Sequence, residues 1–177
     1  LEVRGQLRCR LLLLVETRSR GFLHFRPAGR TQGCPRQGLE TLFFYPAAAP
    51  FTETVISHFD LLPDLRVFRV DFDATTFQPE DFLWLPHHQR LSNAVDKRKA
   101  EHLAGRIAAC EALRFYGVKN TVPGMGLQRE PCWPPGFTGS VTHIHNMALA
   151  TVMIDEPPLR AGIGIDCEEI MTPQLAQ

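Results

Sequence analysis

The sequence predicts an α+β fold, because strand patterns and one long helical pattern follow one another in irregular order, without the regular alternation of a parallel α/β sheet. The helical pattern covers residues 92–116, and the clearest strand patterns cover residues 65–73, 148–154 and 161–169. The chain has 177 residues, of which 44% are hydrophobic and 21% are charged. These values are typical of a globular domain that is long enough to bury a core.

The first of these patterns is the strand at residues 65–73, where apolar and charged side chains alternate over the last half. Residues 77–89 follow and contain Pro79, Pro86 and two adjacent histidines. Proline lacks the backbone N–H that helices and sheets use, so we expect a loop or a short turn of helix here.

The long helix begins after Ser92 or Asn93, because either side chain can cap the first free N–H groups. We expect the helix to run to about Tyr116, where Gly117 supplies the stop. Apolar side chains recur at the helical period and predict one core-facing side, formed by Leu103, Ile107, Cys110 and either Leu113 or Arg114.

The last third of the chain is predicted to hold two strands. Residues 122–136 are rich in glycine and proline, and we expect an irregular connector there. Residues 148–154 then form an apolar run that predicts a buried strand, and residues 161–169 form the second strand after a turn at Pro157–Pro158.

Charge divides the chain into two parts. Residues 1–40 carry eight Arg and three Glu, a net charge of +5, whereas residues 41–177 carry eleven basic and sixteen acidic groups, a net charge of −5. The total of zero excludes a dedicated polyanion-binding protein, which needs a strong basic excess. We interpret residues 1–40 as a leader outside the folded domain of residues 41–177. The alternative is a short strand or helix that docks on the domain through Leu11–Val15.

The cysteines and the apolar runs indicate the cellular compartment in which the protein is expected. The five cysteines are odd in number and include no C-x-x-C pair, which favours reduced thiols in a cytoplasmic protein. The longest apolar run, Leu11–Val15, has five residues and is too short for a membrane span or a signal peptide.

The sharpest local pattern is a pair of carboxylates near the end of the chain. Asp166 and Glu168 alternate with Ile165 and Cys167, so a strand would place the two acids on one face. Paired carboxylates need a compensating cation, and their oxygen atoms suit Mg²⁺ that is held jointly with substrate phosphates. The alternative is the solvated end of a strand.

Basic residues follow the long helix at a spacing of four, at Arg98, His102 and Arg106. Guanidinium groups without acidic partners at this spacing suit phosphate, and the alternative is a solvated helix face on which Glu101 offers local pairing. His143 is either a satisfied core residue or a phosphate ligand at the entry to a strand. His143 and His145 could also form a mixed transition-metal site with Asp166 and Glu168.

Two further features have simpler interpretations. We expect His87 and His88, which follow Pro86, to lie on a loop surface. Trp133 lies between prolines without the interleaved basic residues of a nucleic-acid site, so we expect it to be a packing anchor.

These patterns together resemble the 4'-phosphopantetheinyl transferases of the enterobactin-synthase type. The motifs that carry the resemblance occur in order between about Phe68 and Met171, at Asp71–Asp73, Phe82–His87, Lys97–Ala109, Gly126–Pro134, Gly139–His143 and Gly164–Glu168. The resemblance implies a fold built from two pseudo-two-fold α+β halves with an antiparallel sheet and a long helix, of which this chain looks like the first half and the start of the second.

The resemblance also implies roles for individual residues. Asp166 and Glu168 would coordinate Mg²⁺, and Arg98 and Arg106 would hold phosphates of coenzyme A. The remaining coenzyme A residues would be Thr142 together with Arg129 and His143, which would approach the 3'-phosphate or the pyrophosphate. Neither tryptophan begins the W-x-x-K-E signature, whose acid and lysine complete the family's site, so no catalytic residue is assigned.

The function that the resemblance implies is Mg²⁺-dependent transfer of the 4'-phosphopantetheine arm of coenzyme A to a serine of a carrier protein domain. The carrier domains would be those of a cytoplasmic nonribosomal peptide synthetase that makes an enterobactin-like siderophore. No nucleic acid or membrane partner is expected. The alternative is a truncated, non-catalytic remnant that still binds coenzyme A or a carrier protein.

Overall fold

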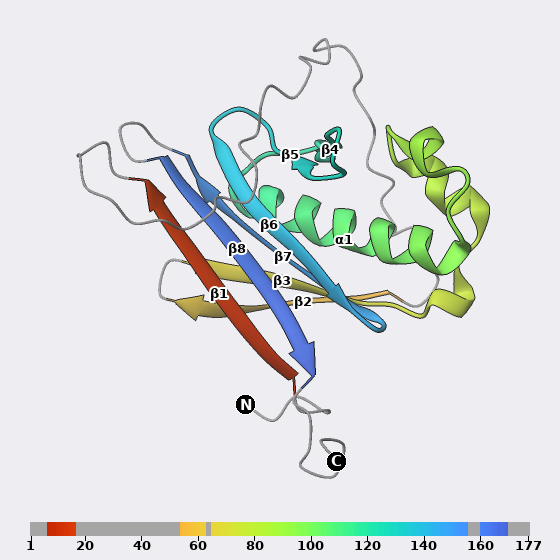
Figure 1. The fold of residues 1–177 in the computed structure, drawn as a ribbon, viewed down its shortest axis with the longest axis horizontal. Coiled ribbons are helices and arrows are strands. Elements are labelled where there is room, and N and C mark those ends of the chain that lie inside the picture. The colour runs from red at the N-terminus through yellow and green to blue at the C-terminus, as the bar shows by residue number, and fades with distance from the viewer. Residues whose placement is uncertain (1–6, 17–53, 63–64, 156–159, 170–177) are drawn as a thin grey trace.

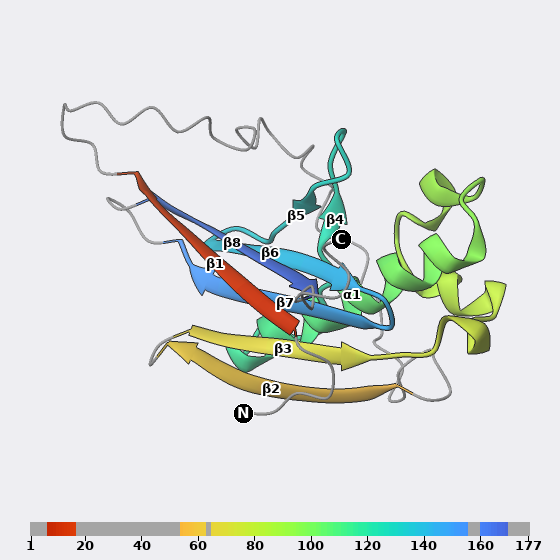
Figure 2. The same ribbon diagram turned by 60° about the horizontal axis from the view of Figure 1, so that its bottom comes forward.

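The computed structural model describes residues 7–16, 54–62, 65–155 and 160–169. A long helix, α1 (Asp96–Phe115), packs on one face of a four-stranded antiparallel sheet, and a two-stranded ribbon packs on the other (Figures 1 and 2). The predicted α+β class, with an antiparallel sheet and one long helix, is confirmed. The sheet has the order β2-β3-β7-β6, with bounds Val55–Leu62, Leu65–Asp71, Met147–Ile154 and Phe137–Ile144.

The smaller elements complete the description. The ribbon pairs β1 (Leu7–Glu16) with β8 (Arg160–Glu169), and a short hairpin pairs β4 (Gly124–Met125) with β5 (Pro131–Cys132). Three short 3₁₀ helices lie between β3 and α1, at Ala74–Thr76 (η1), Pro79–Trp84 (η2) and His88–Leu91 (η3). The expected loop or short turn at residues 77–89 therefore consists mainly of 3₁₀ turns.

The predicted helix begins later than expected. Its N-cap is Val95, because Ser92 instead ends η3 in a helical backbone conformation. The predicted C-terminus is correct, since Tyr116 is the C-cap and Gly117 follows with a φ of +82°. The predicted core-facing residues Leu103, Ile107, Cys110 and Leu113 are all buried.

Alternation along β7 divides the core into two layers. Ala148 and Ala150 face the helix layer, whereas Met147 and Leu149 pack with Ile165 of β8 on the opposite face. A strand that is buried on both faces has no polar side to present to solvent. The run at residues 148–154, which is apolar except for Thr151, follows directly from that position.

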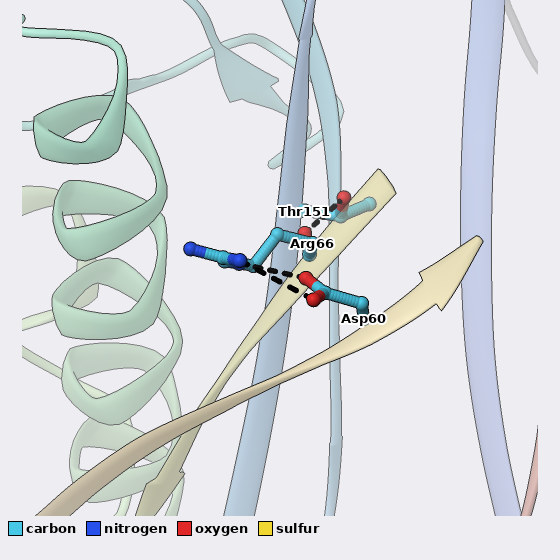
Figure 3. Close-up of polar contacts among 3 residues, drawn as sticks. All are labelled: Asp60, Arg66 and Thr151. Carbon is cyan, nitrogen blue, oxygen red and sulfur yellow. Dashed lines mark hydrogen bonds and ion pairs between the residues drawn. The ribbon is translucent and has the colours of Figure 1, made fainter. Parts of the chain in front are cut away.

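Polar contacts stabilise the β2 edge of the sheet. Arg66 of β3 binds Asp60 of β2 through two of its three guanidinium nitrogen atoms, with Nε donating to Oδ1 at 2.7 Å and Nη2 to Oδ2 at 3.2 Å (Figure 3). The hydroxyl of Thr151, on β7, donates to the backbone oxygen of Arg66 at 2.8 Å. These bonds join three neighbouring strands and satisfy the one polar group of Thr151, which is fully buried.

Two strands of this sheet, β2 and β6, were not predicted. Residues 137–144 form β6 and pair with the whole of β7, whereas the sequence predicted that a strand would begin only at about His143. His143 therefore lies near the end of a strand and not at its entry. His145 occupies the tight turn after β6, with a φ of +47°, and does not continue the strand.

The leader and the cysteines differ in part from expectation. Residues 7–16 form β1, which is the docking-strand alternative, while the other residues of the leader and Pro157–Pro158 lie outside the described residues. The division into a leader and a domain stays a prediction. Cys132 is disulfide-bonded, so the expectation of reduced thiols is wrong there, whereas Cys110 and Cys167 form no disulfide bond. Among the described residues, no helix has both the length and the apolarity that a membrane span requires.

Candidate functional site

A pocket of about 160 Å³ opens between α1, β6 and the β4–β5 hairpin. Figure 1 shows α1 and the β4–β5 hairpin beside β6, which is an edge strand of the sheet. The close approach of α1 to β6 depends on Gly105, where a Cβ atom would lie 2.9 Å from Cγ1 of Val141. The pocket brings together all five residues predicted to bind coenzyme A, namely Arg98, Arg106, Arg129, Thr142 and His143.

Arg106 is the most deeply buried charge of the pocket, with 3% of its surface exposed. One nitrogen, Nη2, donates to the backbone oxygen of Gly124 at 2.9 Å, but Nε is buried and has no hydrogen-bond partner in the described part of the chain. Burial lowers the pKa of this guanidinium to about 10. A buried cation with an unsatisfied donor favours an anion as its ligand.

Arg98 lies at the outer end of the same pocket and makes different contacts. Its Nη1 atom lies 2.6 Å from Nε2 of His143 and 3.3 Å from a carboxylate oxygen of Glu101. The local pairing that the sequence left open is therefore present for Arg98. For Arg106, no carboxylate partner is found among the described residues.

The predicted carboxylate face of β8 is confirmed in its geometry. Asp166 and Glu168 are exposed, whereas Ile165 and Cys167 are buried on the opposite face. The Thr142 hydroxyl donates to Oδ1 of Asp166 at 3.3 Å, so the pocket and the carboxylates share a border. Two hard oxygen donors beside an anion pocket fit a magnesium ion that also binds a phosphate.

The mixed transition-metal site is not supported. His145 lies in the turn that follows β6, with a φ of +47°, and so does not share a strand face with His143 as the sequence suggested. Over residues 54–62, 65–155 and the described part of β8, no group of three or more His, Cys, Asp or Glu side chains could hold a metal ion.

The sequence patterns did not predict a pair of histidines, His87 and His102, that lies next to the pocket. His87 is 6% exposed, so the expectation of a loop surface is wrong for this residue. Its Nε2 atom lies 2.8 Å from Nε2 of His102, which lines the pocket between the two helical arginines. Burial, and then the charge of Arg106, lowers the pKa of His87 to about 4 and that of His102 to about 3. The only signal for this pair was the spacing of His102 from Arg98 and Arg106.

Trp133 has the packing role that the sequence predicts. It is partly buried against two clusters of core residues, and its ring lies where a Cβ atom on Gly139 would meet it at 2.7 Å. The indole thus fastens the end of the β4–β5 hairpin to β6.

The comparisons with known proteins agree with this geometry. Residues 87–153 match the family model described as "4'-phosphopantetheinyl transferase N-terminal domain". The chain is 54% identical to enterobactin synthase component D of Salmonella typhimurium over 121 residues. This aligned region covers 68% of this chain and 49% of that protein. It is 50% identical over 108 residues to enterobactin synthase component D of Escherichia coli K12, covering 61% of this chain and 49% of that protein.

The chain thus spans about half the length of the curated relatives that it matches. The matched family region contains α1, the β4–β5 hairpin and β6, which are the three elements that form the pocket. The resemblance predicted from the sequence is therefore confirmed for residues 87–153, which match the N-terminal domain of the 4'-phosphopantetheinyl transferases.

Proposed function

We propose that this chain carries the coenzyme A-binding part of a 4'-phosphopantetheinyl transferase that acts on carrier protein domains in cytoplasmic siderophore synthesis. The observation that supports it most strongly is the position of Arg106, a buried guanidinium that faces a pocket without a carboxylate partner in the described part of the chain. The printed name of the relatives, enterobactin synthase component D, supports the siderophore context.

The pocket residues have distinct tasks in this proposal. Arg106 binds a phosphate at the base of the pocket, where the low dielectric strengthens the attraction and the unsatisfied Nε gains an acceptor. Arg98 and Arg129 hold phosphate oxygens nearer to solvent. His143 orients Arg98, because Nε2 of the imidazole accepts a hydrogen bond from Nη1 of the guanidinium at 2.6 Å.

The carboxylates of β8 would hold the metal ion. Asp166 and Glu168 present oxygen atoms on one exposed face, and Thr142 fixes the carboxylate of Asp166 at the border of the pocket. A bound Mg²⁺ would supply charge neutralisation for the pyrophosphate of coenzyme A.

The reaction is a phosphoryl transfer in which positioning and electrostatics supply most of the catalysis. The carrier serine oxygen forms a bond to the phosphorus next to pantetheine, and the bond from that phosphorus to the bridging pyrophosphate oxygen breaks. Adenosine 3',5'-bisphosphate leaves with the bonding electron pair, and the serine hydroxyl loses its proton. The base that accepts this proton is not assigned to any residue of the chain.

A second candidate function is binding of coenzyme A without transfer. It is favoured by the lining of the pocket, because its described residues explain phosphate binding but include none to which deprotonation of the serine is assigned. The two candidates differ only in whether the bound arm reaches a carrier serine.

The two candidates are separated by one assay, in which the chain is incubated with pantetheine-labelled coenzyme A, Mg²⁺ and an apo carrier domain of a siderophore synthetase. Label on the carrier serine supports transfer. Coenzyme A binding without label supports the binding candidate. Absence of both label and binding would overturn the proposed function, and an Arg114→Met variant, altered outside the pocket, serves as the matched control for arginine substitutions.

A further inference from the structure

The turn that precedes α1 contacts two walls of the pocket at once. This turn, His87–Leu91, consists of η3 and its N-cap residue. Arg90 of the turn reaches the β4–β5 hairpin, where Nη1 donates to the backbone oxygen of Met125 and Nη2 to that of Gly126 at 2.9 Å. One guanidinium therefore binds two successive carbonyl groups, a geometry that a lysine cannot reproduce.

One of these two carbonyl groups, that of Gly126, also fixes the backbone of Arg129. The N–H of Arg129 donates to the oxygen of Gly126 at 3.1 Å, and the N–H of Gly126 donates to the oxygen of Glu130 at 2.9 Å. Arg129 has a φ of +69°, a backbone conformation that a non-glycine residue keeps only where its surroundings impose it. The Gly126 oxygen thus accepts bonds from Arg90 and from the residue that carries the pocket guanidinium.

The β4–β5 hairpin leaves its backbone little conformational freedom at Gly126. A Cβ atom on Gly126 would lie 2.0 Å from Oε1 of Glu130, so the loop folds tightly over its own backbone. Arg106 adds a third contact by donating to the oxygen of Gly124. Arginine side chains therefore bind three consecutive carbonyl groups of the hairpin, two through Arg90 and one through Arg106.

The other contact of the turn is with the helix. His87 is buried and meets His102 at 2.8 Å between the Nε2 atoms, and His102 lies on α1 beside Arg106. The turn therefore has fixed points on both sides of the pocket. A change at Arg90 releases only the contact with the hairpin, because the histidine pair holds the turn against α1.

We propose that Arg90 is a positioning residue of this pocket, which holds the hairpin so that the Arg129 guanidinium lies at the ligand. Arg90 does not line the pocket, so it acts through Arg129 and not on the ligand. The inference rests on the proposed function, since it takes the ligand to be a phosphate group of coenzyme A.

A double-mutant cycle with coenzyme A as the titrant tests this role. Arg90→Met and Arg129→Ala each weaken binding by about tenfold, the usual size of one charge-assisted contact. The double variant binds no more weakly than Arg129→Ala alone, because the two residues act in series. Binding by Arg90→Met at the wild-type affinity, or single effects that multiply to about a hundredfold in the double variant, would contradict the proposal.

Hydrogen exchange provides a readout that does not depend on the ligand. In Arg90→Lys, the N–H of Arg129 exchanges faster than in the wild type, while the N–H groups of α1 exchange at an unchanged rate. Unchanged exchange at Arg129 overturns the positioning role even where Arg90→Met fails to fold. Failure of the proposed function is distinguishable, since it would appear as absence of coenzyme A binding by the wild-type chain itself.

Discussion

At the scale of single residues, Arg106 combines burial with an unmatched charge. Its Nε atom lacks a partner within the described residues, and burial opposes the charged form, which is why its pKa falls to about 10. The guanidinium nevertheless remains charged at neutral pH. A buried positive charge of this kind is costly unless an anion binds, so its presence is best explained by a ligand.

We expect Arg106→Met to weaken coenzyme A binding by about 10- to 100-fold, since a hydrogen bond to a charged group contributes roughly 1.5–3 kcal/mol. Titration calorimetry measures the change. Arg106→Lys retains the charge but not the planar fork, and we expect an intermediate affinity. Wild-type affinity in Arg106→Met would remove the central residue of the proposed site.

The histidine pair predicts a dependence of stability on pH. The folded-state pKa values of His87 and His102 lie near 4 and near 3, below the ordinary value of 6.5, so the unfolded chain binds more protons in acid. Their contribution to stability is complete above pH 6.5 and is lost as the pH falls toward the folded-state values. We expect the free energy of unfolding to drop below pH 6.5 by up to about 1.4 kcal/mol per pH unit for each group.

Urea unfolding at pH 7, 6 and 5 measures this slope. A His102→Gln variant should show a shallower decline than the wild type, because it lacks one of the two histidines whose pKa values are lowered. Equal slopes in His102→Gln and the wild type would mean that the pair does not titrate as its burial requires.

At the scale of elements, the sequence predicted the parts whose burial follows a simple period. The helix α1, the strand β3 and the doubly buried strand β7 are of this kind. The strand β6 escaped prediction because most of its side chains are only partly buried, so its polar residues leave no alternation. Its strand character comes from pairing with β7 along its whole length, a tertiary effect.

The site residues also divide into those that a local sequence pattern predicts and those that it does not. Arg98 and Arg106 were found from helical spacing, and Asp166 and Glu168 from strand alternation. His87 and Arg90 were missed because their partners lie 15 and 35 or more residues away, and no local pattern marks such contacts. The placement of Arg129, Thr142 and His143 at one pocket was expected only from the family resemblance.

The packing of α1 on β6 gives a prediction for Gly105. In an ordinary helix, Gly→Ala stabilises by about 1 kcal/mol. Here the new Cβ atom would lie 2.9 Å from Val141, so we expect Gly105→Ala to destabilise the wild-type chain instead. Val141→Ala removes the obstructing atom, and in that background the same substitution should become neutral or stabilising. Denaturant midpoints measure both effects, and destabilisation of equal size in the two backgrounds would contradict the assigned contact.

The carboxylate face of β8 gives a prediction about the metal. Asp166→Asn removes a charge but keeps the size and exposed position of the side chain. We expect this variant to bind coenzyme A with an affinity that no longer responds to added Mg²⁺, whereas the wild type binds more tightly as Mg²⁺ is added. Calorimetry with and without the metal measures the difference. The same Mg²⁺ response in the variant and the wild type would show that Asp166 is not a ligand.

At the scale of the whole molecule, the two parts of opposite charge meet in one ribbon. β1, from the segment of net charge +5, pairs with β8, and its register sets Arg8 opposite Glu168 and Arg10 opposite Asp166. The zero net charge therefore conceals two regions of opposite sign that the fold joins at the strand of the two carboxylates. A local anion pocket is compatible with this balance, because binding depends on the few charges that line the pocket.

The central claim is that the pocket binds coenzyme A through its phosphates, and one titration series tests it most directly. The wild-type chain is titrated with coenzyme A, with adenosine 3',5'-bisphosphate and with pantetheine, which carries no phosphate, at fixed Mg²⁺ and ionic strength. We predict binding of coenzyme A and of the bisphosphate, both weakened in Arg106→Met, and no measurable binding of pantetheine. Binding of pantetheine as tight as that of coenzyme A, or absence of binding by all three compounds, would contradict the account.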